Sequence, residues 1–184
     1  MASKFVATTD LDAYAMYPTK ILALSVSNDY PFTSLAVGPI AATLTHIAFE
    51  RKLGGNGAQL DILENKVPKT TVLQTISSGL VVHPTSETFF YVEAANIWRV
   101  DYASNAGTVL TGLPSPPDHL AIDSKAVLYW TALDATVPPL FGGASDGKSG
   151  WVKLYAIGSP IQCLATGTNA VYWVSQGVPF KGHK

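Results

Sequence analysis

The side chains that could carry out chemistry are few and widely spaced in this sequence. The histidines His46, His83, His119 and His183 show neither the His-x-x-x-His nor the His-carboxylate spacing of a metal site. Residues 142–149 contain the letters of a Gly-x-Ser-x-Gly nucleophile motif and of a Gly-x-x-x-x-Gly-Lys-Ser/Thr phosphate loop. We assign neither site there, because both motifs require a strand followed by a helix and this sequence shows little helical periodicity. These patterns predict no catalytic residue, and they identify no metal ligand.

Two glycine-containing segments are better candidates for ligand recognition. Leu133–Gly150 combines charged side chains with an apolar centre, and Arg51–Gln59 carries a second glycine cluster. Loops held on a rigid scaffold often carry binding residues, although glycine and serine also favour a plain surface insertion. The predicted ligand-binding residues are Asp134, Leu140, Phe141, Asp146, Lys148 and Asn56.

Composition excludes several classes of protein. Charged residues make up 14% of the chain, and 12 basic side chains against 13 acidic ones leave no basic face for nucleic acid. No stretch approaches the roughly 18 consecutive apolar residues of a membrane span. The first residues lack the apolar run of a secretory signal, so we expect a soluble protein, cytoplasmic or exported by another route. Cys163, the single cysteine, is interpreted as a buried small hydrophobe.

The elements that must position these loops are indicated by a recurring hairpin. The segment His119–Ala135 reads Leu-Ala, a turn, then an aromatic pair, and the scheme recurs in Cys163–Gly177, in Gly79–Ala94 and, stretched, in 34–50. Frequent Gly and Pro between β-branched and aromatic residues favour strands, which we also expect for Ala41–Leu53 despite its partly helical spacing. The anchoring leucines Leu35, Leu80, Leu120 and Leu164 recur about every 40 to 45 residues, the length of one four-stranded propeller blade.

The repeat predicts a single all-β domain over residues 1–184, a four-bladed β-propeller. Three blades span about 32–76, 77–115 and 116–161, and the third takes Gly150–Ile157 as its third strand. The fourth, 162–184, would be a composite blade completed by 1–31, because the chain begins and ends part-way through a blade and joining the termini hides two strand edges. The alternative is half of a larger propeller built from two chains.

Two of the hairpins carry a family resemblance. The segments VLYWTAL, from Val127, and AVYWVSQ, from Ala170, are preceded by LAID and LATG. They resemble the Tyr-Trp-Thr-Asp class of β-propeller repeat and the shorter bacterial repeats with a Val-Tyr-Trp strand, with Ala132 in the place of the Asp. The resemblance extends roughly over residues 20–177, and in blade number the prediction is similar to the hemopexin-like proteins.

The aromatic pairs themselves are interpreted as structural. Neighbours along a strand point to opposite faces, so Tyr129 and Trp130 must face different blades, and the same holds for Tyr172 and Trp173. Burial of each large aromatic contributes roughly 2 to 3 kcal/mol, enough for a ring of such pairs to hold the sheets together.

Three functions fit this prediction. The preferred one is a non-enzymatic binding or assembly module, lectin-like or protein-binding, which recognises a protein surface or a carbohydrate through its rim loops. The second is a small propeller hydrolase or lactonase with a channel metal, for which Asp118, Asp123 and Asn169 are the available polar residues. An ion near His83 and His119 would be its only cofactor. The third is a self-assembling structural subunit, a homo-oligomer favoured by the low charge.

Overall fold

A computed structural model describes residues 5–8, 13–17, 20–23, 28–31, 36–42, 46–52, 58–64, 67–72, 78–86, 88–101, 106–132 and 137–184. Side chains are described for 40–42, 47–49, 79–86, 88–101, 107–132 and 137–184. Throughout these ranges the regular elements are strands, so no helix in them is long and apolar enough to cross a membrane.

The first two sheets are four-stranded and antiparallel, with their strands in chain order. One contains β1 (Phe5–Thr8), β2 (Ala13–Tyr17), β3 (Lys20–Ala23) and β4 (Asn28–Pro31). The next contains β5 (Ala36–Ala42), β6 (His46–Lys52), β7 (Ala58–Glu64) and β8 (Val67–Val72), so the segment with partly helical spacing is indeed made of strands.

Three further sheets follow in the second half of the chain. The third contains β9 (Ser78–Val82), β10 (Thr88–Glu93), β11 (Asn96–Asp101) and β12 (Ala106–Val109). The fourth contains β13 (Pro117–Ile122), β14 (Val127–Ala132), β15 (Pro139–Ala144) and β16 (Val152–Ala156). The fifth has three strands, β17 (Ile161–Thr166), β18 (Ala170–Ser175) and β19 (Val178–His183).

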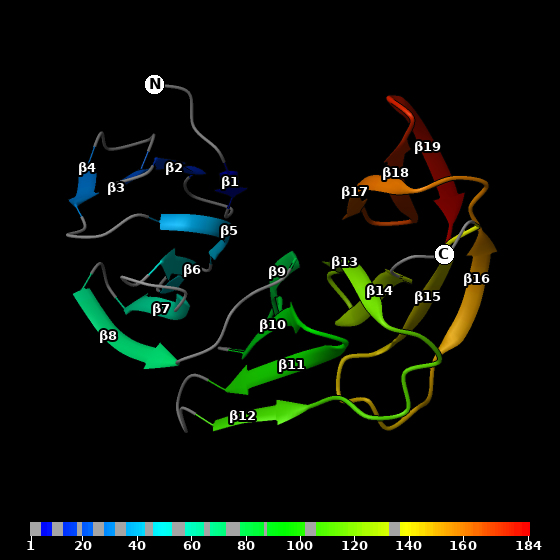
Figure 1. Ribbon diagram of the computed structural model, residues 1–184, viewed down its shortest axis with the longest axis horizontal. Helices are drawn as coiled ribbons and strands as arrows, with labels where there is room; N and C mark the ends of the chain where they lie inside the picture. The colour runs from blue at the N-terminus through cyan, green and yellow to red at the C-terminus, as the bar shows by residue number, and fades with distance from the viewer. Residues whose placement is uncertain are drawn as a thin grey trace.

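The sheets follow one another around an arc, as Figure 1 shows. The first strand of every sheet lies innermost, and β5, β9, β13 and β17 contact one another in that order, with β1 against β5. The sheets with β1 and with β17 stand on either side of the open part of the arc. Each sheet therefore behaves as one blade, and the inner strands form a common central surface.

The hydrophobic core lies between neighbouring blades, as the aromatic pairs predicted. Tyr91 packs with Ala41 and Ala48 of the blade before it, whereas its neighbour Phe90 packs with Leu120 and Trp130 of the blade after it. The next pair repeats this arrangement. Trp130 faces back into the same cluster as Phe90, while Tyr129 faces forward into a cluster with Val171 and Trp173. Adjacent residues of one strand thus stabilise two different interfaces.

The expectation of an all-β fold is confirmed, but the predicted pairing of the two termini is not what the described strands show. β1–β4 form a sheet of their own, and β17–β19 pair only with one another. The described strands therefore make five sheets, where the sequence predicted three blades and a composite of 162–184 with 1–31. Local pairing explains the difference, because closing a short hairpin costs less chain entropy than bringing distant termini together.

The register also corrects one anchor of the repeat. Leu80, Leu120 and Leu164 lie opposite Tyr91, Trp130 and Trp173 of the second strands. In the second blade the residue opposite Phe49 is Ile40, and Leu35 precedes β5. A register irregularity between Ala36 and Ile40 shifts the repeat here, so the Leu-Ala pair was a misleading marker in this copy.

Candidate functional site

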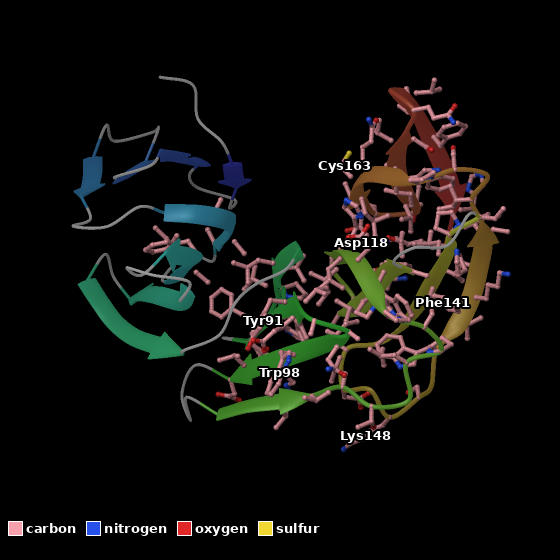
Figure 2. The ribbon with its side chains drawn as sticks, in the orientation of Figure 1. Tyr91, Trp98, Asp118, Phe141, Lys148 and Cys163 are labelled. Carbon is pink, nitrogen blue, oxygen red and sulfur yellow. The ribbon has the colours of Figure 1, made fainter. Side chains whose placement is uncertain are left out.

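The apolar part of the predicted rim loop is not a loop. Leu140 and Phe141 lie in β15, the third strand of the fourth blade, and are 0% and 7% exposed. Phe141 stacks on Trp130 with 4.4 Å between ring centroids, and Figure 2 shows it among the sheets. The segment expected as the third strand, Gly150–Ile157, supplies the fourth strand, β16. Leu140 and Phe141 are therefore core residues of a strand and not part of the rim loop that the sequence predicted.

The charged part of that segment is a tight turn between β15 and β16. Asp146 and Lys148 are both exposed, and the Lys148 backbone N–H donates to the Asp146 carboxylate at 3.0 Å. Figure 2 shows Lys148 at the outer edge of the arc. Asp134 and Asn56, the other two predicted binding residues, lie outside the described residues. The structure thus brings none of the described candidates together into a rim site.

The histidines proposed for a channel ion lie toward opposite ends of the inner strands. Gly79 of β9 lies against Leu120 of β13, and the last residues of both strands line one cavity, so the two strands run side by side in the same direction. His119 is near the start of β13, with its Nδ1 2.8 Å from Asp118 Oδ2, while His83 follows the end of β9. Burial and the charge of Arg99 lower the pKa of His83. In the described part of the chain, no group of three or more His, Cys, Asp and Glu side chains could hold a metal.

An apolar cavity of about 440 Å³ lies along the inner strands. The described part of its wall comes from four blades and consists mainly of small aliphatic side chains. Among these described residues the one polar side chain, Thr166, donates its hydroxyl to the Ile122 carbonyl at 2.7 Å. This bond ties β17 to β13. The lining residues are Ala41, Ala42, Val81, Val82, Leu120, Ala121, Ile122, Leu164, Ala165 and Thr166.

A polar cleft of about 410 Å³ lies between the fourth and fifth blades, beside the turn that follows β13. The turn is organised by Asp123, whose Oδ1 accepts the backbone N–H groups of Lys125 at 2.9 Å and Val127 at 3.0 Å. Ala126 completes the turn with a φ of 61°. Short polar side chains commonly fold back in this way onto backbone groups of a turn, which leaves the second carboxylate oxygen free to face the cleft.

That second oxygen, Oδ2, receives two side-chain donors. The Tyr129 hydroxyl donates to it at 3.1 Å and the Lys184 ammonium at 2.7 Å. The ammonium also donates to the Gly167 carbonyl at 2.6 Å and lies 5.3 Å from the centre of the Tyr129 ring. The Asp123 side chain is only 3% exposed and that of Lys184 15%. A buried carboxylate, a carbonyl and an aromatic face therefore surround one cation.

The surroundings change the titration of both acidic groups in the cleft. Burial by itself raises the pKa of Asp123, but hydrogen bonds from Lys184, from the backbone of Val127 and Lys125 and from Tyr129 outweigh burial and hold the pKa below its usual value. Burial, with the charge and hydrogen bond of Asp123, raises the pKa of Tyr129 well above its usual value. Asp123 is thus ionised and Tyr129 neutral at pH 7.

Two residues proposed for a channel hydrolase meet in this cleft, since Asn169 and Asp123 both line it. Asp118, the third, is at the other end of β13 beside His119. Lys184 was not predicted, and the repeat gave no signal for it because it lies 61 residues from Asp123. Cys163 also differs from expectation, because its thiol is free and exposed.

The radial stack of antiparallel sheets defines a β-propeller fold, and solved structures share it. The chain is similar to a TolB-like protein from Agrobacterium tumefaciens, with 15% identity and a TM-score of 0.65 over 89% of this chain and 65% of that one. It is similar to the tricorn protease, with 11% identity and a TM-score of 0.67 over 95% of this chain and 19% of that one. An auxiliary nutrient binding protein from Bacteroides thetaiotaomicron gives 12% identity and a TM-score of 0.62 over 95% and 52%.

These similarities establish the fold. No family model matches the chain, and no curated protein does. The chain spans less than two thirds of the length of each of these three solved structures. The resemblance to Tyr-Trp-Thr-Asp repeats stays a prediction, as does a larger ring built from two chains.

Proposed function

We propose that this protein is a non-enzymatic binding module that takes an apolar segment of a protein partner in the cavity along its inner strands. The observation that carries the proposal is the chemistry of the cavity wall, which is aliphatic across four blades and whose hydroxyl, on Thr166, already has an acceptor. A cavity of this size and polarity suits one or two small aliphatic side chains. The fold supports a binding role as well, since one similar propeller is described as a nutrient binding protein.

A protein ligand fits this wall better than a carbohydrate does. A sugar carries many hydroxyl groups, each of which loses free energy when it is buried without a hydrogen-bond partner. The described lining residues offer no aromatic face for a sugar ring. The described aromatic side chains Tyr91, Phe90 and Trp130 are buried in the interfaces between blades. The proposal therefore moves recognition from the rim loops to the central surface.

The test introduces one charge into the cavity. Ala165 is exposed and lines the cavity. Ala165→Asp should therefore weaken binding of an apolar peptide at least tenfold, because the bound peptide would bury the new carboxylate without a partner. Ala156→Asp is the matched control, since Ala156 is exposed at the end of β16 and away from the cavity. Peptides selected from a random display library on the wild-type protein would be measured against both variants by calorimetry.

Three results would overturn the proposal. Selected peptides that bind both variants equally would place recognition elsewhere. Specific binding on a glycan array with no peptide selected would favour the carbohydrate ligand. A stoichiometric divalent ion that a chelator removes, together with hydrolysis of lactone substrates, would favour the enzyme.

A further inference from the structure

The cleft between the fourth and fifth blades contains a cation-binding arrangement that the proposed function does not use. Its components come from separate elements: Asp123 from the turn after β13, Tyr129 from β14, and the Gly167 carbonyl from the turn after β17. All three converge on the Nζ atom of Lys184, which follows β19. We propose that these groups form a binding site for a primary ammonium group, which Lys184 fills as an exchangeable ligand of the chain itself.

The donor geometry selects a primary ammonium among cations. An alkylammonium has three N–H donors, and here Asp123 Oδ2 and the Gly167 oxygen accept at 2.7 and 2.6 Å. The Tyr129 ring adds attraction for the charge at 5.3 Å, and it also offers an apolar surface to the carbon stem. A quaternary ammonium lacks the N–H donors, and a neutral side chain of the same length lacks the charge.

The carboxylate is held ready for a cation whether or not Lys184 is present. Its Oδ1 is fixed by the backbone N–H groups of Lys125 and Val127, and its Oδ2 accepts the Tyr129 hydroxyl. These bonds keep the side chain of Asp123 in place and 3% exposed. Binding of a cation to such a preorganised acceptor costs little conformational entropy, because the groups of the acceptor are already ordered before the ligand arrives.

Lys184 is positioned as a ligand that can leave. Lys184 as a whole is an exposed residue, although its side chain is only 15% exposed. Its backbone N–H makes only a long hydrogen bond, 3.4 Å, to the Asn169 carbonyl. Lys184 itself lines the cleft of about 410 Å³, a volume that can hold the stem of another lysine or of a small alkylamine. A tethered group of this kind competes at an effective concentration of roughly millimolar order.

The site consists of Asp123 and its neighbours and shares no lining residue with the apolar cavity. Its chemistry is shared by two sources, free alkylamines and lysine side chains of a protein. The experiment uses the full chain with Lys184→Met, which keeps an unbranched apolar stem and removes the ammonium, and with Lys184→Ala as a second variant. Binding of n-butylammonium and of Nα-acetyl-lysine methylamide would be measured by calorimetry and by thermal unfolding at constant ionic strength.

We expect both amines to bind Lys184→Met at least tenfold more tightly than wild type. At ten times the dissociation constant, an amine should raise the melting temperature of the variant by about 3 to 6 °C. Tetramethylammonium and Nα-acetyl-norleucine methylamide should give no such rise. The double variant Lys184→Met with Asp123→Asn is the matched control and should lose the effect of every amine.

Each source has its own outcome. If n-butylammonium binds and the lysine derivative does not, the site accepts free amines only, whereas binding of both extends it to a lysine of a partner. The proposal is overturned if neither amine binds Lys184→Met and Lys184→Ala, or if the double variant binds them equally well. Equal stabilisation by tetramethylammonium would overturn it too, because the effect would then be one of charge screening.

Discussion

Tyr129 and Tyr172 occupy the same place in consecutive blades, and this equivalence allows a controlled test of what holds the fold together. Tyr129 lies opposite Ala121 in the register of its blade and Tyr172 lies opposite Ala165. Among the described residues, only Tyr129 packs against a following blade. Tyr129 is 4% exposed, whereas Tyr172 is 43% exposed, with Lys181 Nζ 6.0 Å from the centre of its ring.

The expected costs of removing the two rings differ severalfold. Tyr129→Ala should lower the free energy of unfolding by about 3 to 5 kcal/mol, the usual loss for a buried aromatic, because it opens a cavity beside Val171 and Trp173 and removes a donor from Asp123. Tyr172→Ala should cost less than about 1 kcal/mol, the size of an exposed cation–ring contact.

Thermal unfolding followed by circular dichroism would measure the difference. For a chain of this length, about 2 to 4 °C accompany each kcal/mol, so Tyr129→Ala should lower the melting temperature by roughly 6 to 20 °C and Tyr172→Ala by no more than about 4 °C. Equal losses would refute the reasoning. They would show that another sheet covers the β18 face in solution, as the two-chain alternative requires.

Three further outcomes follow from single residues. Gly79→Ala should cost at least about 2 kcal/mol in chemical denaturation, because at φ +57° its Cβ would lie 2.9 Å from the Leu120 nitrogen; Gly112→Ala, at φ +71° with open space around it, should cost only about 1 kcal/mol. Stability of the wild type should fall as pH drops through the lowered pKa of Asp123, since the unfolded state binds that proton more tightly; melting temperatures of Asp123→Asn should vary less in that acidic range. A thiol reagent should label Cys163 in the native protein without denaturant.

Each of these has a contrary result. Equal costs at Gly79 and Gly112 would show that the contact with Leu120 relaxes freely. An acid transition of Asp123→Asn identical to the wild type would mean that other carboxylates govern acid unfolding. Protection of Cys163 from the reagent until the protein unfolds would place its thiol in an interface.

The repeat could be predicted where one interaction recurs at one register position. Leu80, Leu120 and Leu164 each lie opposite a large aromatic of the second strand, so the same packing requirement appears in the sequence each time. The hairpin of β1 and β2 lacks this Leu-Ala and aromatic signature, and the N-terminal sheet was therefore read as part of a composite blade.

The third strand of the fourth blade was missed because glycine was interpreted as a sign of a loop. Gly142 and Gly143 lie inside β15, where a Cβ on Gly142 would come within 3.2 Å of the Tyr129 ring and one on Gly143 within 2.7 Å of Trp151. Glycine in a strand often marks such a close approach. This signal was present in the sequence beside the apolar pair Leu140 and Phe141, and it could have identified a strand.

The polar cleft was beyond sequence reasoning for a different reason. Asp123 is a typical turn residue, and its contact with Lys184 exists only because two blades pack side by side. No periodic pattern relates residues that lie 61 positions apart through such packing. The turn could be predicted from the residues themselves, whereas the partner across the cleft required the arrangement of the blades.

Because neighbours such as Tyr129 and Trp130 point to opposite faces of their blade, each described blade is stabilised mainly by the blades directly next to it. Each interior blade shares one boundary with the blade before it and one with the blade after it, so the unfolding free energy is close to a sum of blade terms and boundary terms. The blade of β17–β19 has a single described boundary, with Tyr172 on its uncovered side. Amide hydrogens there should exchange earlier than those of β10 and β14, and unfolding should travel inward from that end.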